Sequence, residues 1–286
     1  MLSIQFPGRE NALFQARICL AATILLTPTF FHSQALAAWQ GGHTKTSGSA
    51  SAGIPKAELD REAALKAPME QGQTSYKERK YDEAIAHFRE ALEQTKGLDP
   101  KLAGNVLILT TDAALTWMGR SYLKLDQMES ARSTFATQLE SRKKNLPNDS
   151  SVADTLVTLA TIDIRQNSDA KAEDDLKQAI AYIDEAIDHF KSSETYAPRD
   201  SVANDDRRLK SRLELDLAEL YMKQNRYNDA LSACETAFQI GDKFHADLRR
   251  QSEIVSLAIF VAQRANRPHE LRLWEERNNI LKTKKD

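Results

Sequence analysis

Five basic side chains recur at one position of a repeated pattern. Each stands seven residues before a residue that we define below as the anchor of a repeat, and together they form a basic row: Lys77, Lys124, Arg165, Lys223 and Arg264. A row of cations on one surface would attract an acidic segment of another molecule. Lys and Arg are also favoured at the C-terminal end of any helix, because they interact well with the helix dipole. The sequence leaves both interpretations open.

No catalytic or metal-binding constellation accompanies the basic row. The histidines of the later chain lie far apart, whereas a metal site needs clustered ligands: His87, His189, His245 and His269. His269-Glu270 begins like a zinc-protease helix, but Leu273 stands where the second histidine would be. Ser141 and Lys144 have the S-x-x-K spacing of penicillin-binding enzymes without their further motifs. We therefore expect no catalytic residue, no metal, no cofactor and no enzymatic activity.

The composition predicts a helical protein. The chain has 286 residues, of which 41% are hydrophobic and 28% charged, with only 10 Gly and 8 Pro. This length allows a sizeable core, and the scarcity of helix-breaking residues favours helix. The net charge of −2 gives no signature of a nucleic-acid partner. The two cysteines, Cys19 and Cys234, are too few for a disulfide framework.

Residues 1–37 have the features of a cleaved secretory signal peptide. Arg9 and Arg17 precede the apolar run 18–26, and an A-x-A sequence ends at Ala37. The alternative is an uncleaved membrane anchor, but the run is shorter than the roughly 20 residues that a span needs. We expect cleavage after Ala37, no stable membrane span afterwards, and export to a periplasmic or extracellular location. Residues 38–54, rich in Gly and Ser, predict a flexible linker.

Residues 55–286 repeat a pattern of paired helices. Each repeat has a small residue at its anchor position: Ala84, Ala131, Ala172 and Ala230. Twelve residues earlier stands another small residue: Gly72, Gly119, Ala160 and Ala218. Four residues later stands an apolar residue: Phe88, Phe135, Leu176 and Cys234. Offsets of four and seven fall on one helix face, so each repeat predicts two antiparallel helices that pack closely.

The segments around the repeats give further expectations. Ile54–Ala67 predicts a helix that ends before a proline, and 100–125 predicts one long helix. The polar stretch 191–206 predicts an exposed loop. Leu271 takes the anchor position in the last, atypical repeat. There we expect Leu271 and Trp274 to face inward and charged residues to face the solvent.

The repeats resemble those of the tetratricopeptide repeat (TPR) family, a stacked helix–turn–helix solenoid. The residues that carry the resemblance are Gly72, Tyr76, Tyr81, Ala84, Phe88, Ala91 and Pro100 in the first unit, Gly119, Tyr122, Ala131 and Phe135 in the second, and Ala218, Tyr221, Tyr227, Ala230 and Ala237 in the fourth. The third unit, within 152–183, is similar to the longer repeats of kinesin light chains. The spacing of the anchors exceeds the usual period of about 34 residues, so the helices or connections must be longer.

The resemblance implies an all-α fold, a TPR-type α-solenoid of antiparallel helix pairs with atypical capping helices. The solenoid would span 55–286. Its units would lie around 68–100, 101–146, 149–191 and 200–241, followed by a C-terminal cap at 242–283.

In TPR proteins the first helix of each pair lines a concave groove. The resemblance therefore implies that the basic row follows this groove, beside Arg120 and the apolar residues Tyr76, Leu123, Ile164 and Met222. We expect an exported scaffold or adaptor that binds a protein or peptide partner there, an acidic segment being one candidate. The alternative is a structural component of a cell-envelope assembly that self-associates, so oligomerisation is a second expectation.

Overall fold

The structure is a computed structural model that describes residues 56–96, 100–147, 149–192, 199–243 and 247–283. Within these ranges the chain forms ten helices and no strand: α3 (Lys56–Lys77), α4 (Tyr81–Thr95), α5 (Pro100–Lys124), α6 (Met128–Asn145), α7 (Ser151–Arg165), α8 (Asp169–Ser192), α9 (Arg199–Lys223), α10 (Tyr227–Lys243), α11 (Leu248–Arg264) and α12 (Pro268–Thr283). The expected signal peptide (1–37) and linker (38–54) lie outside the described residues. The expected all-α fold is confirmed.

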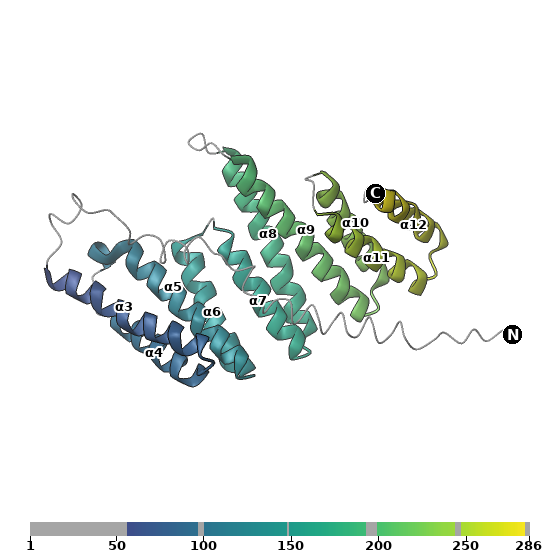
Figure 1. The fold of residues 1–286 in the computed structure, drawn as a ribbon. Coiled ribbons are helices and arrows are strands. Elements are labelled where there is room, and N and C mark those ends of the chain that lie inside the picture. Colours follow the sequence, from purple (N-terminus) through teal and green to yellow (C-terminus); the bar gives the residue numbers. More distant parts are fainter. Residues whose placement is uncertain (1–55, 97–99, 148, 193–198, 244–246, 284–286) are drawn as a thin grey trace.

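The helices stack in chain order. Each packs mainly against the one before it and the one after it, and Figure 1 shows the row that results, from α3 and α4 at one end to α11 and α12 at the other. α3 also contacts α5, and α9 contacts α11, so the first helices approach each other at the first and the last of the four junctions between pairs.

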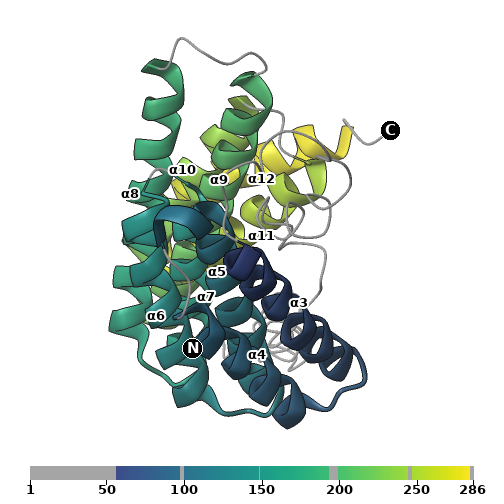
Figure 2. The same cartoon turned by 90° about the vertical axis from the view of Figure 1, so that its left-hand side faces the viewer.

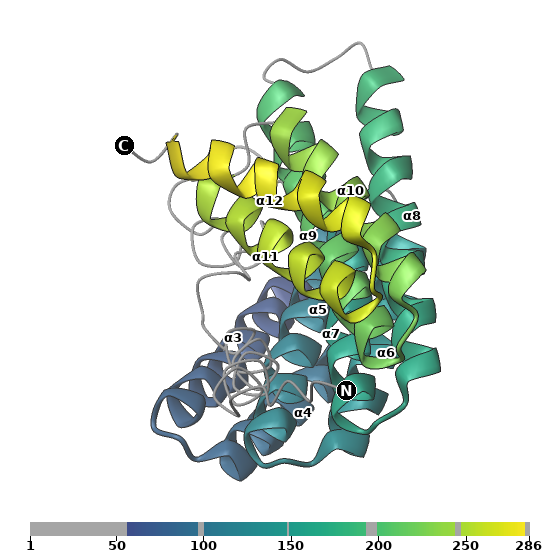
Figure 3. The ribbon, with the colours of Figure 1, turned by 90° about the vertical axis from the view of Figure 1, so that its right-hand side faces the viewer.

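One helix of the third pair, α8, and one of the fourth pair, α9, extend beyond the neighbouring helices at one end (Figures 2 and 3). Figures 2 and 3 show the C-terminal end of α8 and the N-terminal end of α9 side by side, projecting beyond the rest of the stack. These helices have 24 and 25 residues, which accounts for the wide spacing between the third and fourth anchors.

The turn inside each helix pair has the same backbone geometry in all five pairs. Its central residue has a positive φ: Arg79 (63°), Asp126 (58°), Asn167 (55°), Asn225 (60°) and Asn266 (52°). The following residue donates its N–H to the carbonyl five positions back, as Gln127 does to Tyr122 over 2.9 Å. These bonds form a Schellman motif, which ends the first helix and reverses the chain. Every positive-φ residue stands five before an anchor, so Leu271 is the anchor of the last pair.

The anchors lie at the centre of each pair. Their exposed fractions are 0% in the first four pairs: Ala84, Ala131, Ala172 and Ala230. The facing small residues are buried as well, with Gly72 under the ring of Phe88 and Gly119 under the ring of Phe135. The predicted close packing of small residues is therefore confirmed.

Two expectations about helix boundaries are wrong. The helix expected to end before Pro68 continues through it, so α3 is a single helix of 22 residues. Pro68 is buried in a helix that packs against α4 and α5, and this packing outweighs the local cost of proline. The loop expected over 191–206 is shorter, because α8 continues to Ser192 and α9 begins at Arg199. Asp206 is only 4% exposed, so tertiary packing overrides the polar composition of this stretch.

The last helix closes the stack. Trp274 is 4% exposed and its ring centre lies 5.7 Å from that of Phe238, so it faces the core as expected. Leu271 is half-buried. The outward face is less polar than expected, since Leu273 and Ile280 are 45% and 55% exposed.

Candidate functional site

The five members of the basic row occupy equivalent positions. Each lies in the last turn of a first helix, two residues before the positive-φ residue. Lys77, Lys124, Lys223 and Arg264 are exposed, and Arg165 is half-buried. Because the turn motif is the same in every pair, all five basic residues lie at the C-terminal end of a first helix, next to the turn that leads into the second helix.

Some of these charges already have contacts within the chain. Lys223 Nζ lies 2.7 Å from Asp169 Oδ1, at the start of α8 in the preceding pair. Three residues later, Arg226 Nη1 lies 2.6 Å from Glu173 Oε2 on the same helix. The guanidinium of Arg264 lies 5.1 Å from the ring centre of Phe260. The positive charge of the row is thus reduced at the junction between the third and fourth pairs.

The apolar residues beside the row pack into the stack. Leu123, Ile164 and Met222 are half-buried against the main core, and Tyr76 packs against the core of the first pair. The Tyr76 ring centre lies 5.0 Å from that of Trp117 in an edge-to-face arrangement. Burial raises the pKa of Tyr76. These side chains therefore hold consecutive pairs together and present only part of their surface to solvent.

Arg120 belongs to the same aromatic cluster. Its guanidinium carbon lies 5.3 Å from the ring centre of Trp117, a cation–π contact. Burial lowers the pKa of Arg120, because the charged form loses its water. Within the part of the chain that the structure describes, Trp117 Nε1 is buried without a hydrogen-bond partner. The structure thus places Arg120 beside the Trp117 ring, one helical turn before Lys124 at the end of α5.

Sequence reasoning missed a buried ion pair between α5 and α6. Arg142 donates from Nε and Nη2 to the two carboxylate oxygens of Asp112, at 2.5 and 2.7 Å, and both side chains are buried. Arg142 Nη1 donates to the carbonyl of Ser151 at 2.6 Å, which ties α7 to the pair. Gln138 stands where the first, third and fourth repeats have Ala, and it donates to Asp112 Oδ1 at 2.9 Å. These polar contacts join the core of the first pair to the main core.

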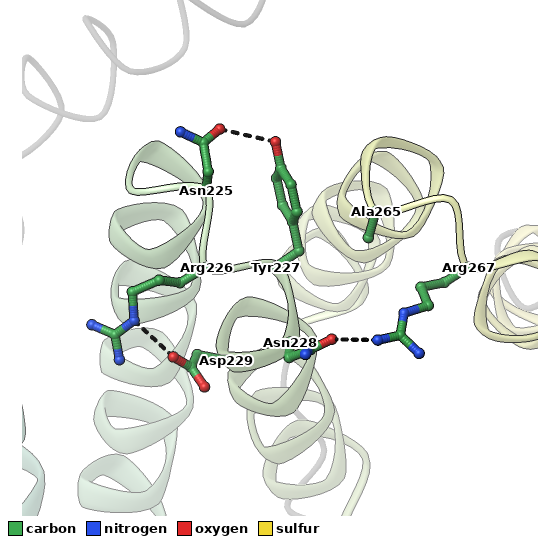
Figure 4. Close-up of a pocket in the computed structure, with 7 residues that line it drawn as sticks. All are labelled: Asn225, Arg226, Tyr227, Asn228, Asp229, Ala265 and Arg267. Atoms are coloured by element: carbon green, nitrogen blue, oxygen red, sulfur yellow. Dashed lines mark hydrogen bonds and ion pairs between the residues drawn. The ribbon is translucent and has the colours of Figure 1, made fainter.

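A pocket of about 410 Å³ opens between two neighbouring turns, α9–α10 and α11–α12. It is lined by Asn225, Arg226, Tyr227, Asn228, Asp229, Ala265 and Arg267. Figure 4 shows Arg267 reaching from the α11–α12 turn toward Asn228, whose Oδ1 accepts from Arg267 Nη2 at 2.9 Å. Arg226 donates to Asp229 Oδ2 at 2.7 Å on the other side of the turn. Of the lining residues, the sequence pattern singles out only Tyr227, as part of the fourth repeat, although Arg226 and Arg267 each follow a member of the basic row by three residues.

The described helices hold no group of three or more His, Cys, Asp or Glu side chains that could bind a metal. None of these helices is long and apolar enough to cross a membrane. Cys234 is a free, buried thiol, and burial raises its pKa to about 12. It is therefore an inert core residue, as its place in the repeat predicts.

Comparisons with known proteins identify the fold. No family model and no curated protein matches the sequence. BtubC (BKLC) from P. vanneervenii matches with a TM-score of 0.52 and 18% identity, over 79% of this chain and 82% of BtubC. A Podosopora anserina putative kinesin light chain with nearly identical TPR-like repeats matches with 0.52 and 16%, over 79% and 98%. MamA matches with 0.50 and 14%, over 77% and 93%. The chain has the TPR-type α-solenoid fold, as the repeats predict.

Proposed function

We propose that the chain is an exported scaffold or adaptor that binds a protein or peptide partner along its first helices. The strongest support is that one turn geometry occurs five times. The C-terminal end of the first helix therefore has the same conformation in every pair along the stack. Such a stack offers an extended surface whose side chains recur at fixed intervals, and solenoids use such surfaces for binding. The described helices hold no cluster of side chains that could bind a metal, and the proposed role requires none.

The partner segment would lie across the ends of successive first helices. Lys77 and Lys124 are exposed there, and they supply positive charge near the aromatic cluster of Tyr76, Trp117 and Arg120. An acidic, extended segment would gain charge complementarity at the first helices and apolar contact with the aromatic rings. Its affinity would fall as salt is added, because exposed charges are screened over about 8 Å at physiological ionic strength.

A second candidate function is self-association in a cell-envelope assembly. Leu273 and Ile280 stand seven residues apart, on one face of α12, and both are exposed. Large exposed apolar side chains that share a face are typical of contact surfaces. Sedimentation at increasing protein concentration distinguishes the two functions, since an adaptor stays monomeric and a self-associating component gains mass.

Photo-cross-linking tests the adaptor function. A photoreactive residue is placed at position 124, at the exposed end of α5, and in a matched variant at position 140, which is exposed on α6. Each purified variant is mixed with the exported proteins of the source cells. We expect a discrete cross-linked product from position 124 and none from position 140. Identical products from both positions, or no product from either, would argue against partner binding at the first helices.

Export is tested on the same protein. Mass spectrometry of the mature chain should find an N-terminus near Ala38. Recovery of an intact 1–37 segment in the final product would contradict export by a cleaved signal peptide.

A further inference from the structure

Two large apolar side chains on α12 are exposed, Leu273 at 45% and Ile280 at 55%. No other large apolar side chain is exposed among the residues whose burial the structure describes. Both stand on the helix that ends the stack and packs mainly against α11; Figure 3 views the stack from this end. Exposed apolar side chains that gather on one face are typical of interaction surfaces.

The other repeats show that the fold does not require apolar residues at these two positions. Leu273 stands two residues after the anchor Leu271, and Ile280 stands nine residues after it. The equivalent residues of the other second helices are also exposed, and all are small or polar: Ala86, Ser133, Asp174 and Ser232 at the first position, and Glu93, Glu140, Ala181 and Gln239 at the second. Among the described second helices the exposed apolar pair is therefore particular to α12.

The face around this pair is complementary to itself. Glu276 and Arg277 lie between Leu273 and Ile280 on the same face, because residues three, four and seven apart share a helix face. Consider two copies of α12 that pack antiparallel about a two-fold axis between positions 276 and 277. Leu273 of each copy then lies opposite Ile280 of the other, and Glu276 lies opposite Arg277. Both ends of the contact are apolar, and its centre brings opposite charges together.

Arg277 is held in place for such a contact. Its Nη1 and Nη2 donate to the two carboxylate oxygens of Glu235 on α10, and its guanidinium carbon lies 4.4 Å from the ring centre of Trp274. The side chain is still 31% exposed. Because Glu235 already compensates the charge of Arg277, Glu276 of a second copy would fix the register of the contact more than its affinity.

We propose that α12 pairs antiparallel with α12 of a second copy of this chain, with Leu273 of each copy against Ile280 of the other. The inference rests on the second candidate function, self-association, and gives it a surface and a stoichiometry. A two-fold contact closes on itself, so it produces a dimer and no longer assembly. Because each copy contributes only two apolar anchors, the interface is small, and we expect a dissociation constant on the order of micromolar.

Sedimentation velocity of the purified chain at increasing concentration measures the dimer. Leu273→Ser together with Ile280→Gln gives α12 the residues that the fourth repeat has at these positions, Ser232 and Gln239. This double variant should raise the dissociation constant of the dimer by about tenfold or more, because both anchors are lost. Its thermal midpoint should stay nearly unchanged, since both side chains are exposed.

The matched control is a second double variant of α12, Glu275→Gln with Lys282→Gln. Both residues are exposed, lie away from the face of Leu273 and Ile280, and have opposite charges, so the net charge is unchanged. Its dissociation constant should equal that of the unmodified chain. Equal weakening by the two double variants would overturn the assignment to this face.

Disulfide formation tests the antiparallel orientation. Leu273→Cys and Ile280→Cys are made separately in a Cys19→Ser background, while Cys234 stays because it is buried. A disulfide needs Cα atoms within about 7 Å, which only directly opposite positions reach. We expect oxidation to link the two variants when they are mixed and to link neither variant efficiently to itself. A strong product from either variant alone would overturn the antiparallel pairing.

The remaining outcomes separate this inference from the proposed functions. A chain that stays monomeric at every concentration overturns the dimer and self-association together, whereas the adaptor function is decided by cross-linking at position 124. A dimer that the Leu273→Ser, Ile280→Gln variant does not weaken overturns the α12 contact and leaves self-association standing. A monomer that binds vesicles of phosphatidylcholine and phosphatidylglycerol, and loses this binding in the same variant, would assign the face to lipid and overturn the dimer.

Discussion

A β-carbon added to Gly72 would lie 2.5 Å from Cε1 of Phe88. The Phe88 ring is 0% exposed, so the surrounding core prevents it from moving aside. The same relationship links Gly119 and Phe135 in the second pair, where the nearest ring atom would lie 2.7 Å away. Close packing of these two helix pairs thus requires a missing side chain on one helix and a large ring on the other.

Gly72→Ala should destabilise the protein by about 1–3 kcal/mol, because an extra methyl group overpacks this contact. The higher helix propensity of Ala, worth about 1 kcal/mol, opposes this cost without cancelling it. Chemical denaturation measures the change. In a Phe88→Leu background the space above Gly72 opens, so the same substitution should cost much less. Equal costs in both backgrounds would show that the ring does not limit the site.

Arg142→Met should destabilise the protein by about 3–5 kcal/mol, because it leaves the buried carboxylate of Asp112 without its cation. Adding Asp112→Asn should recover part of this loss, since the remaining polar group is then neutral. Lys144→Met is the control, because Lys144 is exposed two residues away and should change stability by less than about 0.5 kcal/mol. Similar losses in Arg142→Met and Lys144→Met would contradict a structural role of the ion pair.

Stability should rise as the pH falls from neutral toward about 5. Burial raises the pKa of Asp154 to about 6, and burial together with the nearby Asp149 and Asp205 raises that of Asp206 to about 6. Aspartate in an unfolded chain titrates near 4. The folded state therefore binds protons more readily than the unfolded state. The loss of folding stability that these charges cause reaches its maximum above about pH 6 and disappears below about pH 4.

Asp206→Asn tests this pH dependence. It removes a charge whose Oδ2 is buried without a hydrogen-bond partner in the described structure. The thermal midpoint should rise at pH 7.5 and stay nearly unchanged at pH 4.5, which flattens the pH profile. Glu185→Gln, at an exposed position on α8, should leave the profile as it is. A parallel shift of the Asp206→Asn profile at all pH values would exclude titration of Asp206 as the cause.

The fold could be predicted because it depends on short-range spacing. The anchor, the facing small residue and the following apolar residue lie within 17 positions, so one pair is visible in one stretch of sequence. The turn geometry also has a local signal in the sequence. Asn or Asp stands five residues before the anchor in four of five pairs, and these residues tolerate a positive φ best. Arg79 is the exception, and only the structure places it in that conformation.

The site could be predicted only in part. The members of the basic row all stand seven residues before an anchor, so their equivalent positions in the helices can be predicted from the sequence. The ion pair of Lys223 with Asp169 cannot be predicted in this way, because these residues are 54 positions apart. The same holds for Arg142 and Asp112, which are 30 positions apart and meet only because α5 and α6 have particular rotations about their axes. A single sequence does not reveal these rotations, and the pocket between two turns depends on them as well.

The basic row gives the last prediction. Lys124→Gln, Arg165→Gln and Lys223→Gln together should weaken binding of an acidic partner and reduce its dependence on salt, because three cations at equivalent helix ends are removed. Lys223→Gln alone should contribute least, since its charge is paired with Asp169 at 2.7 Å. Circular dichroism should show unchanged helicity.

The matched control replaces three exposed cations elsewhere: Lys144, Lys171 and Arg249, each by Gln. Both triple variants lose the same net charge, so an affinity loss confined to the first identifies the row as part of the binding surface. Equal affinity losses in the two variants would mean that the row has no special role in binding. Its recurrence would then reflect only the general preference of Lys and Arg for helix C-termini. An affinity that does not respond to salt in the unmodified protein would instead assign binding to Tyr76, Leu123, Ile164 and Met222, the apolar residues beside the row.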